Sequence, residues 1–232
     1  MAVDLRNAST TLDRVNCCTP AGYERIFGPE QVERDVRRYR RKGLTGSAAW
    51  LRDALVNDGV SERSVLEIGG GIGAVQIALL EAGAARAANV ELVNSYESAA
   101  NKLAAERGLD GRVTRRLGDL VSDPGIAPAA DIVVMHRVIC CYPDAAGLIG
   151  AACNHARDRL AITIPRESWW VRLGFSALNT WLRLRNVAFR GYVHPVGRML
   201  ESAGAHGFQP TDRTAGAVWE SVILRRHDAE RA

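Results

Sequence analysis

The sequence predicts a single-domain α/β fold with a Rossmann-like, largely parallel sheet. Residues 64–68 read as a short buried strand, a glycine-rich turn follows at 69–73, and an apolar helix begins at residue 74. Further short apolar segments alternate with helical patterns along the chain, which is typical of strand–helix–strand units. The length of 232 residues suits one domain with a full core.

The composition is that of an ordinary globular protein. Hydrophobic residues make up 47% of the chain, and the net charge of +4 is too small to indicate nucleic acid, so we expect no nucleic-acid partner. Five cysteines without a C-x-x-C pair argue against a disulfide framework. The first residues show no signal peptide and no apolar run reaches about 18 residues. We therefore expect a cytoplasmic protein without a membrane span.

We divide the single domain, residues 1–232, into four parts. Residues 1–58 are expected to form an N-terminal helical cap, 59–165 the cofactor-binding half, 166–194 a helical insertion or lid, and 195–232 a C-terminal helix and hairpin.

Most of the cap is predicted to be helical, after a polar arm at 1–18. A turn or short helix is expected at 20–28, a charged helix at 30–42 and a further helix at 48–57, capped by Ser47. The basic run of the second helix predicts either a solvated face or an anion contact over the cofactor pocket.

The turn at 69–73 predicts a nucleotide-sized site at the carboxyl end of the sheet. Glycine lets the backbone approach a ligand closely, and the helix start adds free N–H groups and a positive dipole end. Gly69, Gly71 and Ala74 satisfy the dinucleotide spacing G-x-G-x-x-G/A. Glu67, however, ends the strand just before them, and a carboxylate there suits a cation better than a pyrophosphate.

The run Glu-x-Gly-x-Gly-x-Gly, made by Glu67, Gly69, Gly71 and Gly73, resembles motif I of the class I S-adenosylmethionine-dependent methyltransferases. This resemblance implies S-adenosylmethionine (SAM) as the cofactor. The acidic residue would face its methionine ammonium, and the glycines, Gly70 included, would lie under its sugar and methionine. It also implies a seven-stranded sheet in the order 3-2-1-4-5-7-6 with the last strand antiparallel.

Two more acidic residues lie at or just beyond the ends of the next two predicted strands, at 87–92 and 112–117. Glu91 lies 20 residues beyond Gly71, where a carboxylate accepts hydrogen bonds from ribose hydroxyls. Asp119 resembles the residue that faces the adenine amino group in this family; a turn or helix cap is the alternative. Leu92 and Leu120 follow these carboxylates and complete the predicted cofactor contacts.

The fourth predicted strand, at 130–135, leads to the place where a substrate would meet the methyl group. His136 is the candidate base, or else a histidine that contacts the adenine or packs in the core. Arg137 could hold an anionic substrate group or pair with Asp144, and Tyr142 could orient the substrate. No metal is predicted, because the Cys-Cys pairs at 17–18 and 140–141 lack ligand spacing.

After a helix at 148–157 and a fifth strand at 159–164, the stretch 167–192 is the most apolar and aromatic of the chain. It reads as one or two amphipathic helices. We expect them to pack on the core, to form a lid over a large, flat or greasy substrate, or to contact a membrane surface. His194 is a further candidate to face the cleft, and Tyr23 and Tyr39 are candidates for an N-terminal lid. A last helix at 195–204 and a hairpin of 208–214 with 218–225 complete the fold.

The predicted function is SAM-dependent methyl transfer to oxygen or nitrogen of a small or medium-sized organic molecule, by a monomer or homodimer. The layout of 141–143, the aromatic insertion and the basic helix are similar to magnesium-protoporphyrin O-methyltransferases, which makes a tetrapyrrole carboxylate one alternative. A non-catalytic SAM-binding protein is the other. A short-chain oxidoreductase would need Tyr-x-x-x-Lys and a hydrolase G-x-S-x-G, and the sequence has neither.

Overall fold

The computed structural model describes residues 20–227 and confirms the predicted fold class. Its seven strands form one sheet in the order β3-β2-β1-β4-β5-β7-β6, and β7 runs antiparallel to both of its neighbours while the pairs from β3 to β5 are parallel. The strands are β1 (Ser64–Ile68), β2 (Arg86–Glu91), β3 (Val113–Leu117), β4 (Ala130–His136), β5 (Ala156–Pro165), β6 (Phe208–Ala215) and β7 (Trp219–Arg226).

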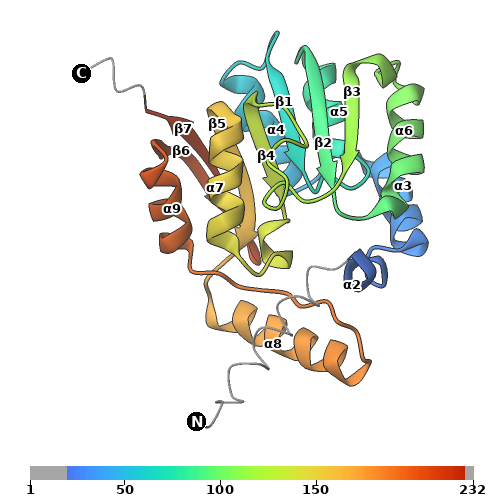
Figure 1. Cartoon of the computed structure of the whole chain (residues 1–232), viewed down its shortest axis with the longest axis vertical. Helices are drawn as coiled ribbons and strands as arrows, with labels where there is room; N and C mark the ends of the chain where they lie inside the picture. The colour runs from blue at the N-terminus through green and yellow to red at the C-terminus, as the bar shows by residue number, and fades with distance from the viewer. Residues whose placement is uncertain (1–19, 228–232) are drawn as a thin grey trace, which may run out of the picture.

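Helices cover both faces of the sheet (Figure 1). The helices are α2 (Pro20–Glu24), α3 (Pro29–Lys42), α4 (Ser47–Asn57), α5 (Ala74–Glu81), α6 (Glu97–Glu106), α7 (Ala145–His155), α8 (Trp169–Leu184) and α9 (Val196–Ala205). Helices α4, α5 and α6 share one apolar core with one face of the sheet, and α7 and α9 share a second core with the other face. Strand β1 is buried on both sides, as expected for a central parallel strand.

The starts of two predicted helices differ from the structure, at α7 and at α4. Helix α7 begins before residue 148, because the side chain of Asp144 accepts a hydrogen bond from the backbone N–H of Gly147 and caps the helix. The insertion forms one helix, α8, which is one of the two arrangements predicted for it. Ser47 is the first residue of α4 and does not cap it. The predicted arm at 1–18, with Cys17, lies outside the described residues.

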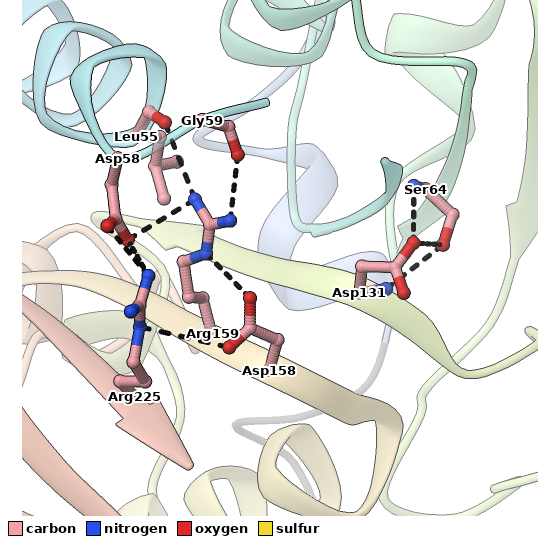
Figure 2. Close-up of polar contacts among 8 residues, drawn as sticks. All are labelled: Leu55, Asp58, Gly59, Ser64, Asp131, Asp158, Arg159 and Arg225. Carbon is pink, nitrogen blue, oxygen red and sulfur yellow. Dashed lines mark hydrogen bonds and ion pairs between the residues drawn. The ribbon is translucent and has the colours of Figure 1, made fainter. Parts of the chain in front are cut away.

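A buried arginine ties three elements together at the amino-terminal edge of the sheet (Figure 2). Arg159 of β5 is 1% exposed and donates to Asp158 at 2.9 Å and to the carbonyl of Gly59 at 2.7 Å. Asp58, at the end of α4, lies 3.3 Å from Arg159 and 2.6 Å from Arg225 of β7. The network therefore fixes α4 against β5 and β7 on the side away from the glycine turn.

A second polar contact at this edge joins β1 to β4. One carboxylate oxygen of Asp131 accepts from the backbone N–H of Ser64 at 2.8 Å and from its hydroxyl at 2.7 Å (Figure 2). Asp131 stands at the start of β4, so its role here is to align the two central strands.

Candidate functional site

One cavity at the carboxyl-terminal edge of the sheet gathers nearly all of the predicted site residues. Its volume is about 410 Å³, within the range of small-molecule sites. The cavity is lined by Glu67, Gly69, Gly70, Gly71, Glu91, Leu92, Asp119, Leu120, His136, Arg137 and Tyr142, with residues of the N-terminal helices on its other side. Of the predicted set, Gly73 does not line it; this glycine is the N-cap of α5.

The glycine turn fits closely between β1 and its neighbours. Gly71 has φ of +55°, a backbone conformation that side chains rarely adopt. A Cβ atom on Gly70 would lie 2.2 Å from the amide nitrogen of Asn89 and 2.7 Å from a carboxylate oxygen of Glu67. A Cβ atom on Gly69 would lie 2.7 Å from the side chain of Val138. Larger residues would therefore fill the floor of the cavity or push these neighbours away.

Glu67 is a buried acid at the end of β1. It is 2% exposed, and one of its oxygens accepts a hydrogen bond of 3.2 Å from the backbone N–H of Gln76 in the first turn of α5. Burial raises the pKa of Glu67 to about 8, so its carboxyl group holds a proton at neutral pH. The buried side-chain amide of Asn89 also lacks a hydrogen-bond partner among the described residues.

Glu91 joins the glycine turn to the end of β2. One carboxylate oxygen accepts from the backbone N–H of Gly71 at 2.9 Å, and the other accepts from the N–H of Leu92 at 2.9 Å. Burial raises its pKa. The oxygen bonded to Leu92 also accepts from the N–H of Val93 at 3.3 Å, whereas the oxygen bonded to Gly71 can accept a second hydrogen bond. Glu91 can therefore hold the turn and still bind a ligand hydroxyl through that oxygen.

Asp119 caps a turn, which is the alternative role predicted for it, and it also lines the cavity. One oxygen accepts from the backbone N–H of Val121 at 3.0 Å, which caps the turn. The other accepts from the hydroxyl of Ser122 at 2.8 Å and from that of Tyr142 at 2.9 Å. Through the hydrogen bond from Tyr142, Asp119 links the end of β3 to the segment after β4 at the wall of the cavity.

His136 and Arg137 meet the same hydroxyl group. The His136 Nε2 atom lies 3.0 Å from the Oγ of Ser47, and Arg137 donates to that Oγ at 3.1 Å. Burial, followed by the charge of Arg137, lowers the pKa of His136 to about 3, so the imidazole is neutral. The Arg137 guanidinium stacks on Trp219 at 4.5 Å, and its buried Nε has no hydrogen-bond partner among the described residues.

The predicted alternative for Arg137, an ion pair with Asp144, is not formed. Asp144 caps α7 instead, and no acidic residue in the described part of the chain pairs with Arg137. Ser47 was missed as a site residue, because only the fold brings α4 beside the end of β4.

The N-terminal helices form the far wall of the cavity. Tyr23 and Tyr39 both line it, as expected, and the Tyr23 hydroxyl donates to the carbonyl of Cys141 at 2.6 Å. Asp35 and Arg38 of the basic helix line it as well and lie 3.5 Å apart. No local signal predicts a site role for Asp35, because nothing in its sequence surroundings distinguishes it from a solvated helix residue.

His194 lies behind the cavity rather than in its lining. Its Nε2 lies 2.9 Å from the carbonyl oxygen of Tyr142, and its ring stacks on that of Tyr192. It therefore supports the segment that carries Tyr142.

The described residues contain no group of three or more His, Cys, Asp or Glu that could hold a metal ion. The sulfur atoms of Cys140 and Cys141 lie 3.7 Å apart, and neither cysteine is in a disulfide. Among residues 20–227, no helix has the length and apolar character needed to cross a bilayer.

No protein-family model matches the sequence, and no curated protein does. Solved structures do match. The magnesium protoporphyrin IX methyltransferase of Synechocystis PCC 6803 with bound SAH has a TM-score of 0.66 at 22% identity, over 94% of this chain and 95% of that one. The same enzyme with bound SAM gives 0.61 at 19% identity, over 97% and 99%.

An O-methyltransferase family protein from Burkholderia thailandensis gives a TM-score of 0.66 at 18% identity, over 86% of this chain and 59% of that one. At these identities the comparisons establish the fold, which is that of the class I methyltransferases. This is the architecture that the run from Glu67 to Gly73 implied.

Proposed function

We propose that this protein transfers a methyl group from SAM to oxygen or nitrogen of a small or medium-sized organic molecule. One observation carries the proposal: Glu67, Glu91 and Asp119, which lie at or just beyond the carboxyl ends of three adjacent strands, line a single cavity beside the glycine turn. Similarity in fold to methyltransferases with bound SAM and SAH supports it.

The residues around the turn fit this cofactor. A side chain at Gly70 would clash with Asn89 and Glu67, so this position needs a glycine. A glycine backbone can also lie close to a sugar. Glu91 keeps acceptor capacity for ribose hydroxyls, and Asp119 with the N–H of Leu120 suits an adenine edge. Glu67 would face the ammonium group. When bound, SAM would supply a methyl group already activated on a sulfonium.

The chain's own contribution is then mainly to position the acceptor and exclude water. The acceptor side of the cavity is walled by Tyr23, Phe27, Leu44 and Ala48, which favours an apolar or aromatic body. His136 is neutral and can accept a proton, but its low pKa makes it a weak base. The site thus favours acceptors that are nucleophilic without strong base assistance.

Calorimetry with SAM, followed by a screen for transfer of labelled methyl groups into a metabolite extract, tests the proposal. We expect saturable binding and label in a small-molecule fraction. Absence of SAM binding by the folded protein would overturn the proposal. Binding without labelling of any fraction would favour the non-catalytic alternative.

We expect SAM binding to release about one proton near pH 7. Burial holds Glu67 protonated between its ordinary pKa of 4.5 and about 8, and a nearby ammonium would favour its ionised form. Affinity should therefore increase as the pH rises through this window. Calorimetry in buffers of different ionisation enthalpy measures the release. Glu67→Gln should abolish the release, and a release unchanged in this variant would assign the proton elsewhere.

A carboxylate acceptor, such as that of a tetrapyrrole, is the second candidate. Arg137 favours it, because its cationic group borders the cavity and has no acidic partner in the described part of the chain. A carboxylate would complete that pairing and needs no base to become nucleophilic. Mild alkali separates the two candidates: labelled methyl esters would release labelled methanol, whereas methylated amines and ethers would keep the label.

A further inference from the structure

Helix α8 presents large apolar side chains to solvent. It lies beyond the strand ends, outside the layers that sandwich the sheet (Figure 1). Trp169 and Leu184, near its two ends, are 78% and 79% exposed, and Leu173 and Trp181 between them are 62% and 51% exposed. Leu178 is exposed as well, at 41%, on another side of the helix. Isolated exposed apolar residues are ordinary, but the other four on one side of one helix form a patch large enough to indicate a partner.

These four side chains form a continuous stripe, which we call the α8 stripe. At 3.6 residues per turn, Trp169, Leu173, Trp181 and Leu184 fall within a sector of about 120°. The opposite side of the helix is the one that packs on the protein, through residues such as Leu182. The stripe is therefore a second apolar face of α8, separate from the face that packs on the protein.

The packed face is held firmly. The side chain of Asn179 donates to the carbonyl of Gly191 at 2.8 Å and accepts from its N–H at 2.8 Å, which clasps the returning chain along α8. The ring of Phe189, on this returning segment, contacts those of Tyr23 and Phe27 with centroids 5.6 and 5.7 Å apart. Because Tyr23 and Phe27 line the cavity, the stripe lies on an element that packs next to the cavity wall.

The surroundings of the stripe are cationic. Residues 168–200 contain five arginines and no aspartate or glutamate. Arg183 and Arg185 flank the stripe, both are exposed, and neither has an acidic partner among the described residues. The Arg185 guanidinium stacks on Trp181 at 5.1 Å. This charge selects against a second copy of the chain, because a symmetric contact through α8 would bring arginines together.

We propose that α8 docks on the surface of a bilayer that contains anionic phospholipids. The stripe would enter the boundary between headgroups and acyl chains, where tryptophan is favoured, and the arginines would contact phosphate groups. Helix α8 would lie in the plane of the surface without crossing it. The cavity would then open next to a reservoir of apolar compounds. The proposal goes beyond the proposed function and does not depend on it.

Co-flotation with vesicles tests the proposal. The full chain should bind vesicles of equal parts phosphatidylglycerol and phosphatidylcholine, with a blue shift of tryptophan emission. Binding should weaken with added salt and fall at least about tenfold on vesicles of phosphatidylcholine alone. Binding to neither vesicle, or equal binding to both, would overturn the proposal.

Two pairs of variants separate the stripe from general charge effects. Leu173→Glu with Leu184→Glu should reduce binding at least about tenfold, whereas Lys102→Glu, an equal change of charge at an exposed position of α6, should not. Arg183→Gln with Arg185→Gln should reduce binding to anionic vesicles more than Arg37→Gln with Arg41→Gln on α3.

If the α8 variants and their controls on α6 and α3 lose vesicle binding to the same extent, the assignment to α8 is overturned. Sedimentation of the full chain without lipid adds a second check: a dimer that the glutamate pair on α8 dissociates would assign the stripe to self-association instead. SAM affinity, measured on the same variants, should stay unchanged, so failure of the vesicle test is distinct from failure of the proposed function.

Discussion

Gly71→Arg is expected to lower the affinity for SAM by about 100-fold or more, which corresponds to roughly 2.7 kcal/mol. Gly71 lines the cavity, and a Cβ atom there would lie 3.3 Å from the ring of Tyr96. The long side chain would then occupy the space proposed for the ligand. It would also bring a cation beside Glu91, whose carboxylate is proposed to bind ribose. Calorimetry with SAM measures the loss.

Gly108→Arg is the matched control. Gly108 has φ of +65°, close to the +55° of Gly71, so both variants carry a similar backbone strain of about 1–2 kcal/mol. A Cβ atom on Gly108 would meet nothing within 4 Å, and this residue does not line the cavity. The control should lose some thermal stability and keep its affinity. Equal affinities for the two variants would show that the cavity is not the SAM site.

Arg159→Met is expected to destabilise the fold by about 3 kcal/mol or more. The substitution roughly preserves volume but removes the buried charge that pairs with Asp158 and donates to the carbonyl of Gly59. Both groups would lose a partner, and Asp58 would lose one of its two arginines. Urea unfolding at neutral pH, followed by far-UV circular dichroism, measures the change in the free energy of unfolding.

Arg225→Met separates burial from charge in the same network. Arg225 contacts Asp58 at 2.6 Å, but its side chain is 43% exposed, so water can replace what the substitution removes. The expected cost is about 1 kcal/mol or less. If Arg159→Met and Arg225→Met lower the free energy of unfolding by the same amount, burial of Arg159 would not explain its contribution to stability.

The proposed cofactor half of the site could be predicted from sequence because its signals are local. Glu67 stands at the end of a strand just before the glycine turn, and Glu91 and Asp119 stand at or just beyond the ends of their own strands, so each can be recognised from its neighbours in the chain. Adjacent parallel strands bring those ends to one edge, so strand order completes the prediction. The structure places all three in one cavity.

The proposed acceptor side could not be predicted in this way, because it is built from residues far apart in sequence. Ser47 contacts Arg137 across 90 positions, and Tyr23 contacts Cys141 across 118. A hydrophobic pattern also does not say which face of a helix finds a partner. For 167–192 it correctly indicated an amphipathic helix, but only the fold shows that Trp169 remains exposed while Leu182 is buried.

The hydrogen bond between Asp119 and Tyr142 joins the two halves of the cavity. One oxygen of Asp119 already accepts from both Ser122 and Tyr142, so a ligand that draws on this oxygen competes with the tyrosine hydroxyl. Occupancy at the end of β3 and the orientation of the loop after β4 are therefore thermodynamically linked. By reciprocity, a ligand at the end of β3 and a ligand beside the loop after β4 would change each other's affinity by the same factor.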